Sequence, residues 1–240
     1  MIWTLVAVGC ATRSPEATAP APVGHVEAVQ ERWLRAEGTN KPDREIPVSW
    51  PRVTALTPEA TAAANAALLP EAVFGDSRAR IEQDGWADEL GYELGLDAFD
   101  LLGLDLWMEG SAAYPDVAAR RVVLDLRTGA RLDASCFAVE RRGELIAKLQ
   151  PALVASMEAA RVEAGTEEDL SAMLEGHAVT EADLDGFGLR PAGVLFHHDF
   201  GFPHVALALE PEEDLLLPWA ELGPFLAPGC ALARAVPSGG

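Results

Sequence analysis

Two runs of alternating apolar and polar residues, joined by a short link, place the strongest constraint on how this chain folds. The runs are residues 89–97 and 102–108, and in the second run every other residue from Leu102 to Met108 is apolar. Alternation with a period of two is typical of a β-strand that buries one face. Two such runs around a short link predict an antiparallel hairpin. Residues 120–127 continue the pattern as a third strand.

The segments before this hairpin have different patterns. Residues 25–38 carry Val26, Val29 and Trp33 at helical spacing, so we expect a helix there. Residues 45–53 are predicted to be extended but not a central strand, because their two prolines cannot donate to a ladder. A further helix is predicted to start at Thr57, since a capping hydroxyl followed by proline favours a helix start.

The main helix is predicted at residues 144–164, where Leu145, Leu149, Leu153 and Met157 form an apolar stripe. Pro151 is expected to kink this helix or to split it. Strands, then helices, then further strands predict an α+β fold with an antiparallel sheet built from hairpins and helices packed on it. The chain is also open to division into two related subdomains, at residues 25–140 and 141–240.

The start of the chain carries a possible export signal. Residues 1–10, MIWTLVAVGC, are apolar, but they are far shorter than the ~20 residues that a membrane-spanning helix needs. They resemble the end of a bacterial lipoprotein signal, although the usual basic region is missing. We expect lipidation at Cys10 and a lipid-anchored location in the cell envelope; another exported form and a cytoplasmic protein are the alternatives. Residues 11–24 are expected to be a disordered tether.

The charge of the chain and its remaining cysteines limit the possible partners and compartments. The formal net charge is −20, which argues against nucleic acid as a partner because phosphates attract Lys and Arg. Such a surface would instead steer a cationic partner toward it. If Cys10 carries lipid, Cys136 and Cys230 remain, and in an oxidising envelope they either pair as a disulfide or stay as two buried thiols.

Residues 193–222 hold most of the candidate chemistry. Alternation in residues 193–199 and 204–210, around a link with Gly201 and Pro203, predicts a second hairpin. A short strand at residues 215–218 and a helix start at 219–222 are expected after it. One hypothesis is a metal-dependent hydrolase in which His197, Asp199 and His204 are the ligands, since His197 and Asp199 share a strand face and His204 would lie across the hairpin. No H-E-x-x-H motif accompanies these residues.

Two stretches carry a family resemblance. Residues 114–137 contain YP, ARRVVLDLRTGARL and a following phenylalanine, and residues 193–226 contain GVLF, an aromatic turn and LLLPWAELGPFL. Together they resemble the RsiV-like extracytoplasmic domain family, a domain of unknown function of the DUF3298 type. That family occurs in a lysozyme-sensing anti-sigma factor and beside the catalytic domain of a peptidoglycan deacetylase. The resemblance covers about residues 45–226 and assigns residues 141–240 to the RsiV-like part.

The resemblance implies an α+β fold and a binding role for a lysozyme-like basic protein or for peptidoglycan, with no catalytic residue and no cofactor. We expect the binding surface at the turn of the second hairpin, because exposed aromatic residues beside acids suit a cationic partner. The predicted binding residues are His198, Phe200, Phe202, His204, Glu212, Glu213 and Asp214.

Overall fold

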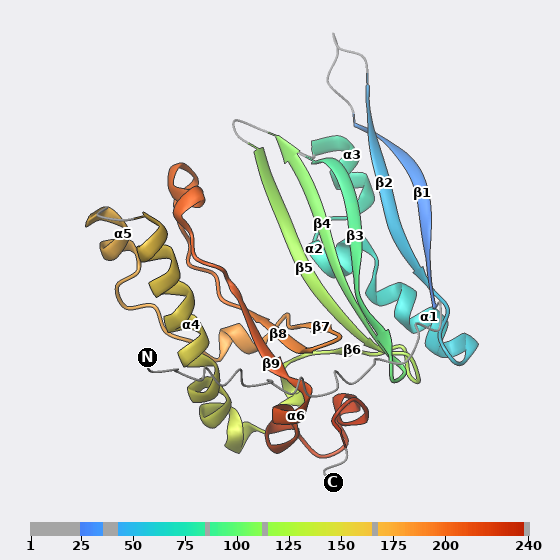
Figure 1. The fold of residues 1–240 in the computed structure, drawn as a ribbon. Helices are drawn as coiled ribbons and strands as arrows, with labels where there is room; N and C mark the ends of the chain where they lie inside the picture. The colour runs from blue at the N-terminus through green and yellow to red at the C-terminus, as the bar shows by residue number, and fades with distance from the viewer. Residues whose placement is uncertain (1–24, 36–42, 85–86, 112–114, 165–167, 238–240) are drawn as a thin grey trace, which may run out of the picture.

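The structure, a computed structural model, describes residues 25–35, 43–84, 87–111, 115–164 and 168–237. Within these residues the chain forms two β-sheets with helices packed on them (Figure 1), which confirms the predicted α+β fold. The expected signal with Cys10 and the expected tether lie outside the described residues. Among the helices that the structure describes, none has both the length and the apolar character needed to cross a membrane.

The large sheet has six strands, and their order across the sheet follows their order in the chain. β2 and β3 are parallel, so the sheet is mixed and not purely antiparallel as predicted. The strands are β1 (Val26–Arg35), β2 (Arg44–Val53), β3 (Ala87–Ala98), β4 (Leu101–Ser111), β5 (Pro115–Asp125) and β6 (Arg131–Leu132).

The prediction of a helix at residues 25–38 is wrong, because the described part of this segment is strand β1. β1 pairs with β2 along its whole length, from Val26 opposite Val53 to Arg35 opposite Arg44. Of the apolar residues that suggested a helix, only Trp33 is fully buried. A long strand partner therefore outweighs helical spacing in a segment that is mostly polar.

β2 lies between β1 and β3, where its two prolines were not expected. Thr54 N donates to His25 O at the end of the β1–β2 ladder. Because hydrogen-bonded pairs alternate in an antiparallel ladder, Pro47 and Pro51 face β3 and not β1. β2 is bridged to β3 only through Val48 and Leu90, so the missing proline N–H groups leave few ladder bonds unmade.

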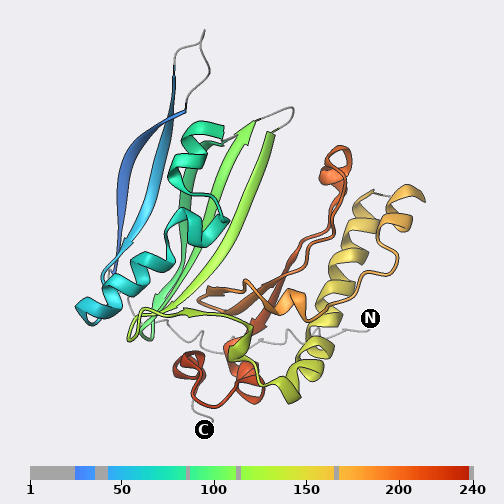
Figure 2. The ribbon, with the colours of Figure 1, turned by 180° about the vertical axis from the view of Figure 1, so that it is seen from behind.

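The hairpin predicted from alternation is confirmed as β3 and β4. Its two turn residues, Phe99 and Asp100, both have positive φ, of 60° and 55°, as a tight hairpin turn requires. The buried side of β4 faces three helices, α1 (Pro58–Ala67), α2 (Pro70–Phe74) and α3 (Arg78–Asp84), which lie on the face of the sheet seen in front in Figure 2. α1 begins as predicted, with Thr57 Oγ1 accepting from Ala60 N.

The small sheet lies on the other side of the large sheet (Figures 1 and 2). The long helix α4 packs on it through the predicted stripe, and Leu145, Leu149, Leu153 and Met157 are all buried. Pro151 lies inside α4 and does not split it. The elements of this half are β7 (Gly188–Arg190), β8 (Gly193–His197), β9 (Asp214–Pro218), α4 (Arg142–Ala164), α5 (Glu168–Met173) and α6 (Trp219–Leu222).

The second predicted hairpin has the wrong partner strand. β8 pairs with β9, with Phe196 opposite Leu215. The expected partner forms the 3-10 helix η4 (His204–Leu209), in which Ala206 N donates to Pro203 O. Leu215 and Leu217 are fully buried on β9, whereas Leu207 in η4 is 46% exposed. The run that buries more apolar surface therefore takes the strand position.

The two halves share one core and are also joined near the C-terminus. Leu101 of the large sheet lies in the same buried cluster as Phe196 of the small sheet. Cys136 and Cys230 form a disulfide, with their Cα atoms 5.2 Å apart. The remaining short 3-10 helices are η1 (Ala134–Cys136), η2 (Val139–Arg141), η3 (Ala182–Leu184), η5 (Gly223–Phe225) and η6 (Ala231–Arg234).

Candidate functional site

The aromatic residues predicted to form a binding surface are buried. His198 and Phe200 are each 5% exposed and Phe202 is 8% exposed. The ring of Phe200 packs against His198 and His177, with centroids 4.8 and 5.0 Å apart. The prediction is wrong because the chain after β8 does not turn at once into a partner strand. It folds back onto the core, and the aromatic rings fill it.

His198 is part of a buried polar chain that the sequence did not predict. Its Nδ1 lies 3.1 Å from Oδ1 of Asp183, and its Nε2 lies 3.1 Å from Nδ1 of His177. Oδ2 of Asp183 accepts from both N and Oγ1 of Thr180, at 2.6 and 2.8 Å. A proton on Nδ1 of His198 satisfies Asp183 and leaves Nε2 to accept from His177. The hydroxyl of this series, that of Thr180, lies on the far side of Asp183, and the group beside Nε2 of His198 is the imidazole of His177. Among the described residues His198 therefore has no hydroxyl or thiol beside it that it could activate as a nucleophile.

The metal hypothesis loses the geometry on which it was built. It required His204 on a strand opposite His197, but the residue opposite His197 in the ladder is Asp214. His204 begins η4, and its side chain is not among those that the structure describes. His197 Nδ1 lies 3.6 Å from Oδ1 of Asp214 and 3.7 Å from Oε2 of Glu213, so acidic side chains are its neighbours.

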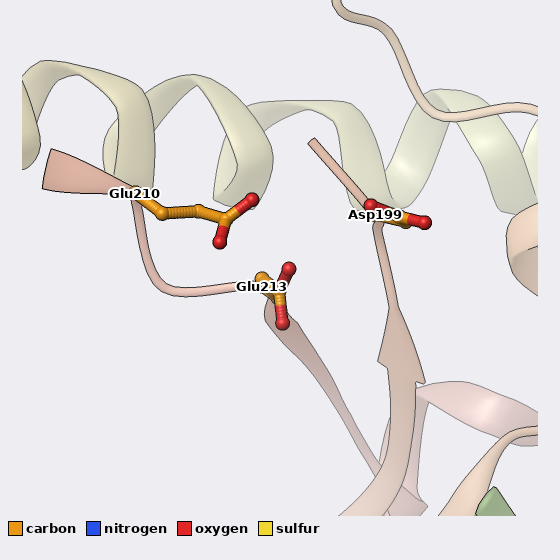
Figure 3. Close-up of side chains that lie close together, drawn as sticks. All are labelled: Asp199, Glu210 and Glu213. Atoms are coloured by element: carbon orange, nitrogen blue, oxygen red, sulfur yellow. The ribbon is translucent and has the colours of Figure 1, made fainter. Parts of the chain in front are cut away.

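Three carboxylates gather where the small sheet ends. Asp199, Glu210 and Glu213 each place an oxygen within 4.8 Å of the others (Figure 3). Glu212, which was also predicted to bind, is exposed beside them. We call Asp199, Glu210, Glu212 and Glu213 the acidic group. Carboxylate oxygens are ligands for a hard cation such as Ca²⁺, which takes about 6–8 oxygens, so three side chains supply only part of such a shell.

Burial and like charges act together on Glu213. Burial raises the pKa of Glu213, and the carboxylates of Glu210, Asp199 and Asp214 add to that rise, while His197 opposes it. The pKa of His197 is raised by the Asp214 carboxylate and by Glu213, against the effect of burial. The acidic group is therefore a place where negative charge is only partly neutralised by the chain itself.

Asp214 belongs to a different set of contacts, between the two sheets. Its Oδ1 accepts from Nη2 of Arg121 at 2.5 Å. Arg121 also lies near Asp105, which in turn is hydrogen-bonded by Arg190. Burial acts to raise the pKa of Asp214, but the interactions with His197 and Arg121 outweigh it, and the pKa lies below its ordinary value. Asp214 thus binds Arg121 and His197 of the same protein and is not free to bind a partner as predicted.

The sequence offered one usable signal for these missed residues. Thr180 and Asp183 have the Thr-x-x-acid spacing of a capping box, in which the acid returns to the backbone of the threonine. Nothing local pointed to the pairing of Arg121 with Asp214, which lies 93 residues away in the chain.

Comparisons with known proteins identify the fold. No protein-family model and no curated protein matches this chain. Solved structures do match it, among them those of two DUF3298 family proteins. A DUF3298 family protein from Pseudomonas aeruginosa PAO1 is 13% identical, with a TM-score of 0.57, and the match covers 90% of this chain and 97% of that one. A DUF3298 family member from Bacteroides fragilis NCTC 9343 is 15% identical, with a TM-score of 0.56, and the match covers 89% and 98%. The resemblance stated from the sequence is confirmed at the level of the fold.

Proposed function

Because this chain has the fold of DUF3298 family proteins, we propose that it is a non-enzymatic lipoprotein of the bacterial cell envelope that binds a basic, lysozyme-like protein. Residues 1–10 support the anchor, since they end in the small-residue and cysteine pattern of a lipoprotein signal. The net charge of −20 supports a cationic partner, because charge of this size steers oppositely charged proteins into encounter.

The acidic group is the observation that carries the choice of surface. Asp199, Glu210 and Glu213 hold like charges close together, and burial with mutual repulsion raises the pKa of Glu213. An arginine or lysine of a partner would relieve this repulsion, because its positively charged group would donate hydrogen bonds to several of these oxygens. This group replaces the aromatic surface, since Phe200 and Phe202 lie in the core.

The binding test uses the full chain with Cys10→Ser, so that no lipid is attached, and a basic lysozyme as the probe. We expect saturable binding by calorimetry, and we expect Glu212→Gln with Glu213→Gln to weaken it by about tenfold, as loss of charge-assisted hydrogen bonds would. Glu59→Gln with Glu71→Gln removes the same charge on the helix-covered side and is the matched control. Equal loss in both double variants would mean that only the overall charge acts.

Peptidoglycan is the alternative ligand, and a second experiment tests it. Sedimentation of the chain with purified, insoluble peptidoglycan, in the absence of lysozyme, would identify the wall itself as the ligand and overturn the choice of a basic protein. The anchor has a separate test: Cys10→Ser should move the protein from the membrane fraction to the soluble fraction. A protein that is soluble with Cys10 intact would contradict the anchor.

A further inference from the structure

A cavity of about 450 Å³ lies beside β5, where this strand extends beyond β6. Its volume falls in the range of about 300–1,000 Å³ that is typical of sites for small ligands. Residues from both halves of the molecule line it, and most of those that carry charge are arginines and aspartates.

The two walls of the cavity carry opposite charge. The large sheet contributes Arg120 and Arg121 from β5 and Arg131 from β6, with one acid, Asp105 of β4, beside Arg121. The opposite wall, from η3 to the end of β8, contributes Asp185 and Asp199 together with Asp183. Among the described residues no ion pair joins these arginines to these aspartates. Arg121 is already paired with Asp214, and Asp183 is paired with His198. Arg131, Asp185 and Asp199 are therefore the charged groups on which a ligand would mainly depend.

Arg121 supplies a second observation. Nη1 of Arg121 is the one buried side-chain nitrogen or oxygen within the described residues that has no hydrogen-bond partner. The other end of this guanidinium is already paired with Asp214. A buried donor without an acceptor is rare in proteins and calls for an explanation, of which a ligand is one. Nη1 is covered by protein atoms, so a carboxylate bound at Arg131 would accept from it after a small shift of the neighbouring side chains.

The third observation is the free edge of β5. Asp125 N donates to Ala130 O, and Val123 is the next residue that pairs toward β6. In an antiparallel ladder every second residue directs its N–H and C=O groups to the same neighbour. The N–H and C=O groups of Arg121 and Ala119 therefore point to the side on which β6 lies, but beyond the end of β6. Ala119 O accepts there from the side chain of Arg120 and from no neighbouring strand in the described part of the chain. An extended peptide can pair with an edge of this kind.

We propose that this cavity binds a short zwitterionic peptide in an extended conformation. Its backbone pairs with the edge of β5 at Ala119 and Arg121, its carboxylate binds the arginine wall, and its ammonium group binds Asp185 and Asp199. The proposal does not depend on lysozyme binding, because the cavity and the acidic group share only Asp199.

The test is a titration of the full chain, carrying Cys10→Ser, with tri-alanine peptides followed by calorimetry. The peptides have both ends free, the amine acetylated, the carboxyl amidated, or both ends capped. We expect the free peptide to bind at least about tenfold more tightly than either singly capped peptide, because each cap removes one charge-assisted set of hydrogen bonds. Methylation of the central amide nitrogen should weaken binding as well, since it removes a donor to the strand edge.

Variants locate the site. Arg131→Gln should weaken the free peptide by about tenfold and leave the amidated peptide unchanged, while Asp185→Asn should weaken the free peptide and leave the acetylated one unchanged. Arg52→Gln, an exposed arginine on β2, is the control and should change neither. No binding of the free peptide at about 10 mM, or equal binding of the free and doubly capped peptides, would overturn the proposal. The peptide series on the unaltered cavity decides the matter even if a variant fails to fold.

Discussion

Nη2 of Arg234 lies 2.5 Å from Oδ1 of Asp125, so the C-terminal turn η6 is tied to β5 of the large sheet. The same guanidinium donates to the backbone oxygens of Phe99 and Asp100 in the β3–β4 turn, at 3.0 Å each. One arginine therefore joins the end of the chain to the tightest turn of the large sheet and to the strand beside it.

Arg234→Ala should destabilise the fold by about 2 kcal/mol, because it removes a partly buried ion pair and two hydrogen bonds to backbone oxygens. Urea unfolding followed by circular dichroism measures the change. Arg127→Ala is the matched control, since Arg127 pairs with Asp100 at an exposed position and should change stability by less than about 1 kcal/mol. If the two variants lost similar amounts of unfolding free energy, the partly buried contacts of Arg234 would contribute no more than an exposed ion pair does.

The Cys136–Cys230 disulfide closes a loop across a sequence separation of 94 residues. By loop entropy such a link contributes about 4.6 kcal/mol, so Cys136→Ser with Cys230→Ser should lower the free energy of unfolding by up to about that amount. Reductant should lower the stability of the parent chain but not that of the double variant. Thiol titration of the denatured, unreduced Cys10→Ser chain should find no free thiol, and two free thiols would contradict the disulfide.

How much the sequence could predict depended on whether the signal was local. Every other residue from Leu102 to Met108 is apolar, and a short link joins this run to the alternating run before it, so the β3–β4 hairpin followed directly. Val26 and Trp33, seven residues apart, would share one face of a helix but point to opposite faces of a strand, so their spacing favoured the helix. The strand forms because β2 pairs with it along its whole length, and the sequence of residues 25–38 alone carries no information about that partner.

The candidate site was harder for the same reason. Asp199 and Glu213 were visible as acids, but their approach depends on β9 lying next to β8, and the sequence pointed to residues 204–210 instead. His198 pairs with a buried aspartate 15 residues earlier, and alternation says nothing about that partner. Aromatic residues near a turn are equally compatible with a surface and with a core, so their burial had to come from the fold.

His197 should titrate above its ordinary pKa of 6.5, because the Asp214 and Glu213 carboxylates favour its charged form. Asp214→Asn should lower the pKa of His197, as followed by NMR of its ring protons, whereas Glu212→Gln should change it little. A group whose pKa is raised on folding stabilises the fold below its unfolded pKa and loses that contribution as the pH rises through the folded value. His197→Gln should therefore reduce the loss of stability that occurs as the pH rises above 6.5. An unchanged His197 pKa in Asp214→Asn would contradict this account.

Phe200 is 5% exposed and packs against two imidazole rings, so its replacement should affect folding and not recognition. Phe200→Ala should destabilise the fold by about 3–5 kcal/mol, as large-to-small changes in cores do. Leu207→Ala, at a position 46% exposed in η4, should change stability by less than about 0.5 kcal/mol. Urea unfolding measures both. If Phe200→Ala kept its stability and lost binding to lysozyme, the aromatic residues would again be candidates for the binding surface. A ring that stabilises the complex and not the core must be accessible to the partner.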